Sequence, residues 1–267
     1  MTRVLLVGCG KMGSALLAGW LDRGIDPAGV VVVEPGLPAV AGGVAVVAAA
    51  DKVPAAFRPD VVVLAVKPQV MAEVAPLYSG YSDAVFLSIA AGKPLAFFAR
   101  HLGERAAVVR AMPNTPAAVR RGVTVCVGNS GTDPGRRAAC QGLLEAVGEV
   151  AWIDDEALMD AVTALSGSGP AYVFLLAEVM AAAGIAAGLP EGLATRLARA
   201  TVSGAGELLH QTPEVSAAQL RVNVTSPGGT TAAALAVLMA ESRGMAPLMA
   251  EAVAAATRRG KELAGPA

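Results

Sequence analysis

The feature that most constrains the fold is the glycine motif Gly8-Cys9-Gly10-Lys11-Met12-Gly13 near the start of the chain. It ends a short apolar run typical of a buried strand, and it opens an amphipathic, helix-like stretch that ends at Gly24. A strand, a G-x-G-x-x-G turn and a helix in this order are typical of a dinucleotide-binding domain. We therefore expect Gly8 to form the turn, Gly10 to admit a pyrophosphate and Gly13 to let helix and strand pack closely. A glycine-rich turn that binds no ligand is the alternative.

Apolar runs alternate with helix-like stretches through the first half of the chain. The runs after the first are residues 30–35, 61–68, 84–92, 106–114, 122–129 and 148–154. Because they show little polar alternation, they predict a parallel sheet covered on both faces. After Asp155 the patterned stretches are all helix-like. We predict an α/β fold, with a Rossmann-like NAD(P)-binding domain at residues 1–155 and an all-helical dimerisation and substrate-binding domain at residues 156–267.

The helix-like half is strongly apolar. The chain is 54% hydrophobic and 16% charged, and helices that are apolar all round bury their surface against partners. The stretch Ala171–Leu189 is long enough to cross a membrane, but it has no Lys/Arg-rich flank of the kind that orients inserted helices. We interpret it as a buried helix of a bundle or a subunit interface, and we expect a homodimer without membrane contact.

Charge and cysteine content disfavour other classes of protein. A net charge of −1 without blocks of like charge gives no general attraction for nucleic acid. The three cysteines, Cys9, Cys126 and Cys140, are odd in number and widely spaced. This pattern favours reduced thiols in the cytoplasm over a disulfide framework or a metal site.

Charged residues end two of the strand-like runs. A carboxylate at Glu34 would accept hydrogen bonds from the adenosine ribose, which favours NADH, and would repel the 2′-phosphate of NADPH. No arginine lies between residues 31 and 40, although Lys52 and Arg58 in nearby loops are alternative partners for that phosphate. Lys67 could meet the pyrophosphate or a ribose. A solvated side chain is the alternative for Glu34 and for Lys67.

The stretch Asn223–Thr231, NVTSPGGTT, places two glycines and several hydroxyls before an alanine-rich, helix-like segment. We expect Thr225 or Ser226 to cap a helix that starts near Gly228. Backbone N–H groups at a helix start lack intrahelical partners, and glycines let a carboxylate approach them. The loop has no Gly-Lys-Ser/Thr ending of a triphosphate cradle. It therefore predicts a seat for a small carboxylate, with an ordinary capped turn as the alternative.

Five segments taken together resemble the pyrroline-5-carboxylate reductase family. They are residues 7–19, 64–69, 110–124, 164–174 and 223–235. The resemblance covers almost the whole chain and implies a Rossmann domain followed by a helical dimerisation domain, often assembled into decamers. It also implies reduction of 1-pyrroline-5-carboxylate to L-proline with NADPH or NADH, the last step of proline biosynthesis. The family mostly prefers NADPH and often has a small or basic residue near position 34, a pattern from which Glu34 departs.

The motifs and the resemblance together predict the site. The cofactor contacts are Val7, Gly8, Cys9, Gly10, Lys11, Met12, Gly13, Glu34, Ala65, Val66, Lys67, Pro68, Ala90, Ala91 and Asn223. The substrate contacts are Glu214, Ser226, Gly228, Gly229, Thr230 and Thr231.

A protonated cyclic imine accepts hydride without a histidine base. The enzyme must mainly position the imine against the cofactor and exclude water. We expect the Thr231 hydroxyl to face the ring nitrogen and Glu214 to stabilise the iminium charge, with an exposed loop glutamate as the alternative. Asn114 either braces the nicotinamide pocket or belongs to a plain turn. The small residues of 166–169 fit a substrate wall and a tight helix joint equally well.

Two rival functions remain at this point. A hydroxyacid dehydrogenase or another imine reductase on the same plan would need a catalytic lysine on the first interdomain helices, and residues 155–196 contain none. A non-enzymatic dinucleotide sensor would have no use for the carboxylate seat.

Overall fold

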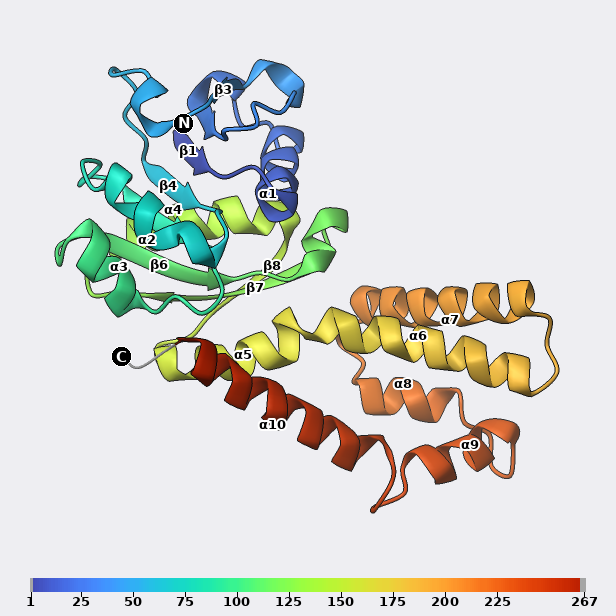
Figure 1. Ribbon diagram of the computed structural model, residues 1–267. Coiled ribbons are helices and arrows are strands. Elements are labelled where there is room, and N and C mark those ends of the chain that lie inside the picture. The colour runs from blue at the N-terminus through green and yellow to red at the C-terminus, as the bar shows by residue number, and fades with distance from the viewer. Residues whose placement is uncertain (1, 265–267) are drawn as a thin grey trace. The chain divides into compact units, whose positions relative to one another are not determined.

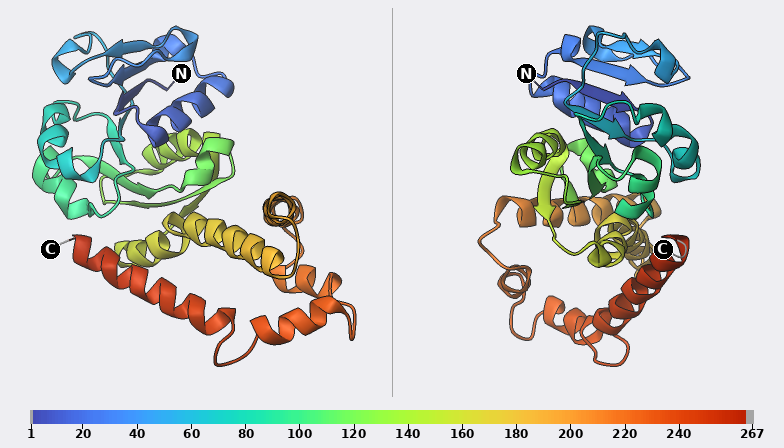
Figure 2. Two further views of the ribbon diagram at one scale, coloured as in Figure 1. Left: turned by 45° about the vertical axis from the view of Figure 1, so that its right-hand side comes forward. Right: turned by 90° about the vertical axis from the view of Figure 1, so that its left-hand side faces the viewer.

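The computed structural model describes residues 2–264. The chain forms two compact units: one runs to Gly167 and includes the C-terminal segment from Ala256, and the other spans Ser168–Ala255. Within the described range, all strands belong to the first unit and every element after β8 is helical (Figure 1 and Figure 2). The boundary near residue 155 stays a prediction.

The strands and α-helices follow the expected order. The strands are β1 Val4–Val7, β2 Val30–Val33, β3 Ala45–Val47, β4 Val61–Leu64, β5 Val85–Ser88, β6 Ala107–Met112, β7 Gly122–Gly128 and β8 Gly148–Trp152. The helices are α1 Lys11–Asp22, α2 Met71–Val74, α3 Leu95–Leu102, α4 Pro134–Leu144, α5 Met159–Val162, α6 Gly169–Ala186, α7 Glu191–Gln211, α8 Ala217–Asn223, α9 Thr230–Leu238 and α10 Met245–Ala264.

One sheet organises the first unit, with strand order β3-β2-β1-β4-β5-β6-β7-β8. The strands β1 to β6 are mutually parallel. Their order, 3-2-1-4-5-6, is that of a doubly wound dinucleotide-binding sheet. The predicted Rossmann-like fold class is confirmed.

Both faces of this sheet are covered. Along β1, Val4 and Leu6 belong to one apolar cluster, whereas Leu5 and Val7 belong to another. Helices α1 and α4 contribute side chains to the first cluster, and α2 and α3 contribute to the second. Alternate residues of one strand thus enter opposite cores, which explains why the strands are continuously apolar. Trp20 of α1, fully buried, also donates from Nε1 to the carbonyl of Leu143 at 2.8 Å.

The sheet differs from the fully parallel one that we predicted, because β7 runs antiparallel to β6. A parallel crossover needs about a dozen residues or more. The link Pro113–Arg121 is shorter: it contains a 3₁₀ turn, Thr115–Val119, which Arg120 follows in the left-handed conformation at φ 58°. Strand β8 then pairs with β7 in parallel, after a crossover through α4. The short edge strand β3 was not predicted.

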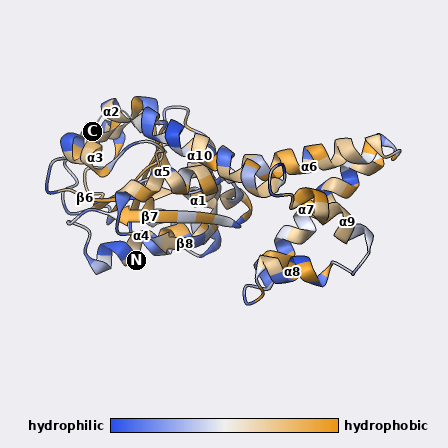
Figure 3. Ribbon diagram, turned by 90° about the horizontal axis from the view of Figure 1, so that it is seen from below, coloured by the Kyte–Doolittle hydropathy of each residue, from blue (hydrophilic) through white to orange (hydrophobic). Residues whose placement is uncertain are grey.

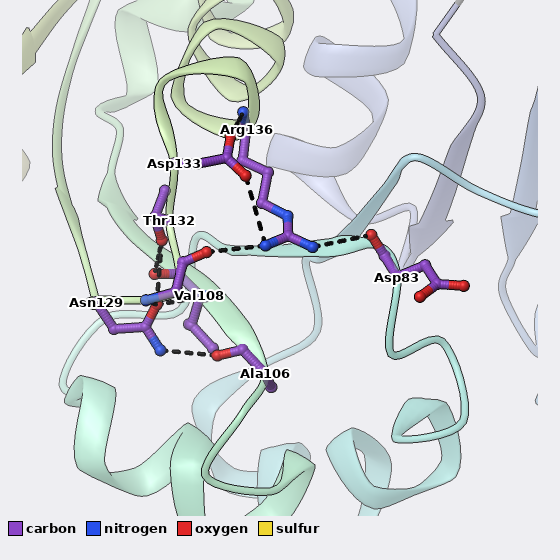
Figure 4. Close-up of polar contacts among 8 residues, drawn as sticks. Asp83, Ala106, Val108, Asn129, Thr132, Asp133 and Arg136 are labelled. Atoms are coloured by element: carbon purple, nitrogen blue, oxygen red, sulfur yellow. Dashed lines mark hydrogen bonds and ion pairs between the residues drawn. The ribbon is translucent and has the colours of Figure 1, made fainter.

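A polar side chain extends the ladder where β7 ends (Figure 4). Oδ1 of Asn129 accepts the Val108 N–H at 3.0 Å, and its Nδ2 donates to the Ala106 carbonyl at 2.7 Å. The Thr132 hydroxyl donates to the Val108 carbonyl at 3.1 Å, and Arg136 reaches the Gly131 and Asp83 carbonyls. These bonds attach the loop before α4 to the amino end of β6.

The second unit has little core of its own. Helices α6 and α7 pack together, but large side chains of the unit stay exposed, for example Phe174 of α6 at 68% and Val237 of α9 at 72%. In Figure 3 hydrophobic residues recur along these helices. Exposed apolar side chains in such number within one helical unit indicate a surface that a partner covers. By length and composition alone, the segment Glu156–Ala186 also passes as a membrane span.

Candidate active site

The carboxyl ends of β1, β2 and β4 meet at one edge of the sheet. Beyond the strands, the Gly8 N–H donates to the Val33 carbonyl at 2.9 Å, and the Ala65 N–H donates to the Val7 carbonyl at 2.8 Å. Strand β1 lies between β2 and β4, where the strand order reverses. Ligands of doubly wound sheets bind outside the carboxyl ends at this point. Most of the predicted cofactor residues therefore share one edge: Val7–Gly13, Glu34, Ala65–Pro68, Ala90 and Ala91.

The glycine loop has the shape that a dinucleotide requires. Gly8 has φ 94°, and a Cβ there would lie 2.9 Å from the backbone of Ala65. At Gly13 a Cβ would lie 2.4 Å from the Gly8 carbonyl oxygen, so only glycine lets α1 pack this closely. At Gly10, by contrast, a Cβ would meet no described atom within 4 Å. The loop is therefore tight toward the protein and open on the side where the pyrophosphate would approach.

The start of α1 is open to an anion. Gly10 is the N-cap residue, and no side chain of the described residues caps it. The first N–H groups of the helix therefore keep their hydrogen-bonding capacity for a ligand. Lys11, the first residue of α1, is exposed, as is Lys67 in the loop after β4. Both lysines thus lie at the carboxyl edge of the sheet, one at the start of α1 and one in the loop after β4.

Glu34 is held against the glycine loop. It directly follows β2, and its Oε2 accepts the backbone N–H of Cys9 at 2.8 Å. Burial, and to a lesser degree the Glu34 charge, raise the pKa of the Cys9 thiol. The thiol is therefore in its neutral form at pH 7 and adds no charge to the loop.

One alternative partner for a 2′-phosphate lies at the other edge of the sheet. Arg58 lines a cavity of about 500 Å³ with Arg3, Asp60 and Asp83, at the amino ends of β1, β4 and β5. Its Nη1 donates to the carbonyls of Ala55 and Phe57. The suggestion that Arg58 meets the phosphate was therefore wrong. Lys52 is exposed and lies 3.2 Å from Asp51.

The predicted cofactor contacts Ala90 and Ala91 lie just beyond the carboxyl end of β5. Ser88 is fully buried, and its hydroxyl accepts the Ala90 N–H at 3.3 Å. Ala90 is buried, and Ala91 is exposed. The turn beyond them has Gly92 at φ 70°. Beyond Ile89, residues 90–92 therefore carry no side chain larger than a methyl group.

The predicted carboxylate seat lies in the second unit, between α8 and α9. The expected cap was wrong, because α9 starts two residues later than predicted and its N-cap is Gly229, with no capping side chain among the described residues. Thr225 instead donates its hydroxyl back to the Arg221 carbonyl at 2.7 Å and so belongs to the end of α8. Gly228 has φ 71°, and the Gly229 N–H donates to the Ser226 carbonyl at 3.0 Å. The first-turn N–H groups of α9 therefore remain available to an acceptor.

The remaining predicted residues lie on or near these helices. Thr231 is the second residue of α9 and is half-buried, whereas Thr230 and Ser226 are exposed. Asn223 ends α8, and its Oδ1 accepts from Gln219 at 2.8 Å, which leaves its N–H₂ group for a ligand. Glu214 is exposed in the loop between α7 and α8.

The sequence did not single out two contacts that shape the site. One is the Cys9 N–H that fixes the Glu34 carboxylate. The other is Ser166, whose Oγ lies 3.4 Å from Nδ2 of Asn114. Ser166 belongs to a π-helical turn, Thr163–Gly167, a conformation that is often found at functional sites. Its only sequence signal was the run of small residues at 166–169.

Comparison with known proteins gives consistent matches along the chain. Residues 3–92 match a family model described as NADP oxidoreductase coenzyme F420-dependent, and residues 156–263 match one described as pyrroline-5-carboxylate reductase dimerisation. A pyrroline-5-carboxylate reductase of Pseudomonas aeruginosa is 40% identical, over 98% of this chain and 97% of its own. A solved pyrroline-5-carboxylate reductase of Coxiella burnetii superposes with a TM-score of 0.89 at 34% identity, covering 98% of both chains. The Plasmodium falciparum pyrroline carboxylate reductase, solved with NADP bound, has a TM-score of 0.81 at 27% identity, covering 99% of this chain and 98% of its own.

The parallel sheet, the glycine loop and the apolar helical half define an NAD(P)H-dependent oxidoreductase with a dimerisation domain. Identity of 40% over nearly the full length makes the assignment specific. The chain belongs to the pyrroline-5-carboxylate reductase family. The predicted family, the NAD(P)H cofactor and the predicted activity, reduction of pyrroline-5-carboxylate, are confirmed.

Proposed function

We propose that the open start of α9 holds the carboxylate of 1-pyrroline-5-carboxylate, and that the glycine edge of the sheet holds NAD(P)H, so that the imine is reduced to L-proline. The observation that carries this proposal is the pair Gly228 and Gly229 before an uncapped helix start. A helix start of this kind favours an anion by about 0.3–1 kcal/mol through its dipole. Each charge-assisted hydrogen bond adds about 1.5–3 kcal/mol.

The hydroxyls around this helix start have separate roles in the proposal. Ser226 and Thr230 are exposed and add donors to the carboxylate. Thr231 is half-buried on the first turn, and we assign its hydroxyl to the ring nitrogen. Glu214 balances the positive charge of the protonated imine. Asn223 uses its free N–H₂ group to contact the dinucleotide.

The dinucleotide half of the site is assigned to the residues at the carboxyl edge. The pyrophosphate binds to the N–H groups that begin α1 and to the side chains of Lys11 and Lys67. The loop Ala65–Pro68 also contacts the dinucleotide. Ala90 and Ala91 leave room for the nicotinamide ring. NAD(P)H supplies the hydride when bound. The protein has to fix both reactants and exclude water, because the protonated imine is already electrophilic.

The experiment measures the decay of NADH and NADPH absorbance with pyrroline-5-carboxylate. Gly229→Val places a side chain 3.1 Å from the Ser226 carbonyl oxygen at the seat. It is expected to raise the KM for the imine about tenfold or more, the effect of losing one charge-assisted hydrogen bond. Gly142→Val is the matched control, since Gly142 is exposed on α4 with open space around it. An unchanged KM in Gly229→Val would refute the seat.

A second variant tests the role of Thr231. Thr231→Ala is expected to lower kcat about tenfold with little change in coenzyme affinity, because it removes a hydrogen bond at the reacting end. Thr231→Ser keeps the hydroxyl and should retain most of the activity. Equal kcat in all three proteins would contradict the role.

Assembly and location complete the proposal. The exposed apolar helices and the dimerisation family support a homodimer, and further assembly into a decamer is carried over from the family resemblance. Size-exclusion chromatography coupled to light scattering distinguishes the mass of a dimer from that of a decamer.

A cytoplasmic location is supported by the three free cysteines, since reduced thiols persist there. Fractionation of expressing cells tests it.

A further inference from the structure

We propose that Glu34 makes NADH the preferred coenzyme of this enzyme and discriminates against NADPH. The inference rests on the proposed function in one respect, the placement of the dinucleotide at the carboxyl edge of the sheet. It goes beyond it by assigning the choice between two coenzymes to one residue. The relevant observations are the position of the carboxylate, its unused acceptor capacity and the charges around it.

The position of Glu34 is fixed at both its backbone and its side chain. Its N–H donates to the Val47 carbonyl at 2.9 Å, which continues the pairing of β2 with β3. Its Oε2 accepts the Cys9 N–H at 2.8 Å, inside the glycine loop. The residue is half-buried. The carboxylate is therefore held against the glycine loop at the end of β2, where an acidic residue of a dinucleotide-binding domain meets the adenosine ribose.

The carboxylate retains capacity for further donors. Apart from Cys9, its one described contact is Oε1 with the Gly36 N–H, at a long 3.5 Å. An ionised carboxyl group has about four acceptor positions. The adenosine ribose of NADH offers two hydroxyl donors at its 2′ and 3′ positions, which match this capacity. NADPH replaces the 2′ donor with a phosphate, which is negatively charged and repels the carboxylate.

The loop that follows Glu34 supplies no counter-charge for a 2′-phosphate. The chain from Glu34 to Val47 contains no lysine or arginine. Arg58 lines a cavity at the opposite edge of the sheet. Lys52 is exposed and lies 3.2 Å from Asp51. A 2′-phosphate at the end of β2 would thus face a fixed carboxylate without a cation from its own loop.

The wild-type protein provides the first test, with two ligands that differ only in the phosphate. ADP-ribose and 2′-phospho-ADP-ribose are titrated by calorimetry, without substrate or turnover. ADP-ribose is expected to bind at least about tenfold more tightly at low salt, because like charges a few ångströms apart repel strongly near a protein surface. The ratio is expected to shrink as salt is raised, since salt screens the repulsion. Equal or tighter binding of the phosphorylated ligand, or binding of neither, would overturn the proposal.

A substitution supplies the second test. Glu34→Gln keeps the side-chain length and an oxygen acceptor for the Cys9 N–H but removes the charge. It is expected to weaken ADP-ribose binding severalfold and to tighten 2′-phospho-ADP-ribose, so that the ratio falls about tenfold or more. Glu73→Gln is the matched control, because Glu73 is exposed on α2. An unchanged ratio in Glu34→Gln would contradict the role of the carboxylate.

The two proposals fail in different ways. If the enzyme reduces pyrroline-5-carboxylate but favours the phosphorylated ligand, the proposed function stands and the assignment of Glu34 is wrong. If ADP-ribose is favoured but Gly229→Val leaves the KM unchanged, the coenzyme assignment stands and the carboxylate seat is wrong.

Discussion

Arg110 and Glu156 form an ion pair with 2.8 Å between Nη1 and Oε1, and only 8% and 28% of their side chains are exposed. Arg110 lies in β6, and the same Oε1 accepts the N–H of Leu95, the first residue of α3, at 2.8 Å. One carboxylate therefore joins the sheet, a covering helix and the segment where strands give way to helices. This contact lies within the first unit and attaches the segment after β8 to the sheet and to α3.

Removing the carboxylate should be costly. Glu156→Ala leaves the buried Arg110 guanidinium without its counter-ion, and breaking a buried pair costs about 3–5 kcal/mol. Because Glu156 is partly exposed, we expect about 2–3 kcal/mol less free energy of unfolding in urea. Glu149→Ala on β8, whose side chain is exposed, is the control and should change stability by less than about 0.5 kcal/mol. Equal stability of the Glu156 and Glu149 variants would show that the pair is not a structural link.

The Asn129 side chain should be similarly important at the other end of β6. Asn129→Ala removes the acceptor for the Val108 N–H and the donor to the Ala106 carbonyl. Leaving backbone groups of two buried residues without partners is expected to cost about 2–4 kcal/mol. The neighbouring Ser130→Ala, at an exposed position, should be close to neutral. Denaturation midpoints measure both, and a midpoint for Asn129→Ala that matches wild type would contradict the ladder role.

Most of the first unit could be predicted because its signals are local. Continuous runs of valine predicted the parallel strands. The spacing of Gly8, Gly10 and Gly13 predicted a turn between the first strand and the first helix. The direction of β7 could not be predicted from the strand residues, because the apolar pattern of Gly122–Gly128 fits a parallel and an antiparallel strand equally well. It is determined by the short link before it, which ends in the left-handed Arg120.

The helical half was harder to predict in detail. The composition of residues 226–231 led to the prediction of a carboxylate seat, which stays a prediction. The helix start was placed too early, because the hydroxyls suggested a cap where the structure uses Gly229. Contacts between distant segments, such as Cys9 with Glu34 or Asn114 with Ser166, leave no periodic signal. They arise only when the fold brings the loops together. The sequence therefore predicted which residues belong to the site, but not which of them are hydrogen-bonded to one another.

Alkaline pH should destabilise the fold through two buried thiols. Burial raises the pKa of the Cys140 thiol to about 12, and burial with the neighbouring Cys140 raises the pKa of Cys126 well above its usual range. In the unfolded chain these thiols ionise near pH 8.5–9. The folded state holds protons that the unfolded state releases, so this stabilisation is complete below about pH 8.5 and is lost as pH rises toward 12.

The expected slope is about 1.4 kcal/mol per pH unit for each thiol above pH 9. It is measured as the free energy of unfolding in urea at several values between pH 8 and 10.5. Cys140→Ala should have a shallower slope than wild type, whatever its stability at pH 8. Replacing the half-buried Cys9 should flatten the slope less. Parallel slopes for wild type and Cys140→Ala would rule out this origin of the pH dependence.

The pair Asn114 and Ser166 gives the last prediction. Oδ1 of Asn114 accepts the Val123 N–H at 3.0 Å, and this fixes which side of the amide faces the π-helical turn. Nδ2 is thereby directed to Oγ of Ser166 at 3.4 Å, so the Ser166 hydroxyl accepts one bond and keeps its proton to donate. Asn114 follows β6, which neighbours β5 at the carboxyl edge of the sheet. The amide thus connects that edge with the turn at Thr163–Gly167.

Asn114→Ala should lower kcat severalfold while the KM for NAD(P)H changes little, because the residue positions the turn without contacting the phosphates. Ser166→Ala should give a similar loss, and the double variant should be no worse than the more severe single one. In stability, the coupling energy of this cycle is expected to be about 0.5–1.5 kcal/mol, the net worth of one hydrogen bond. Thr115→Ala, at the exposed next position, serves as the control. Strictly additive losses in both kcat and stability would mean that the two residues act independently and that the plain-turn interpretation of Asn114 is right.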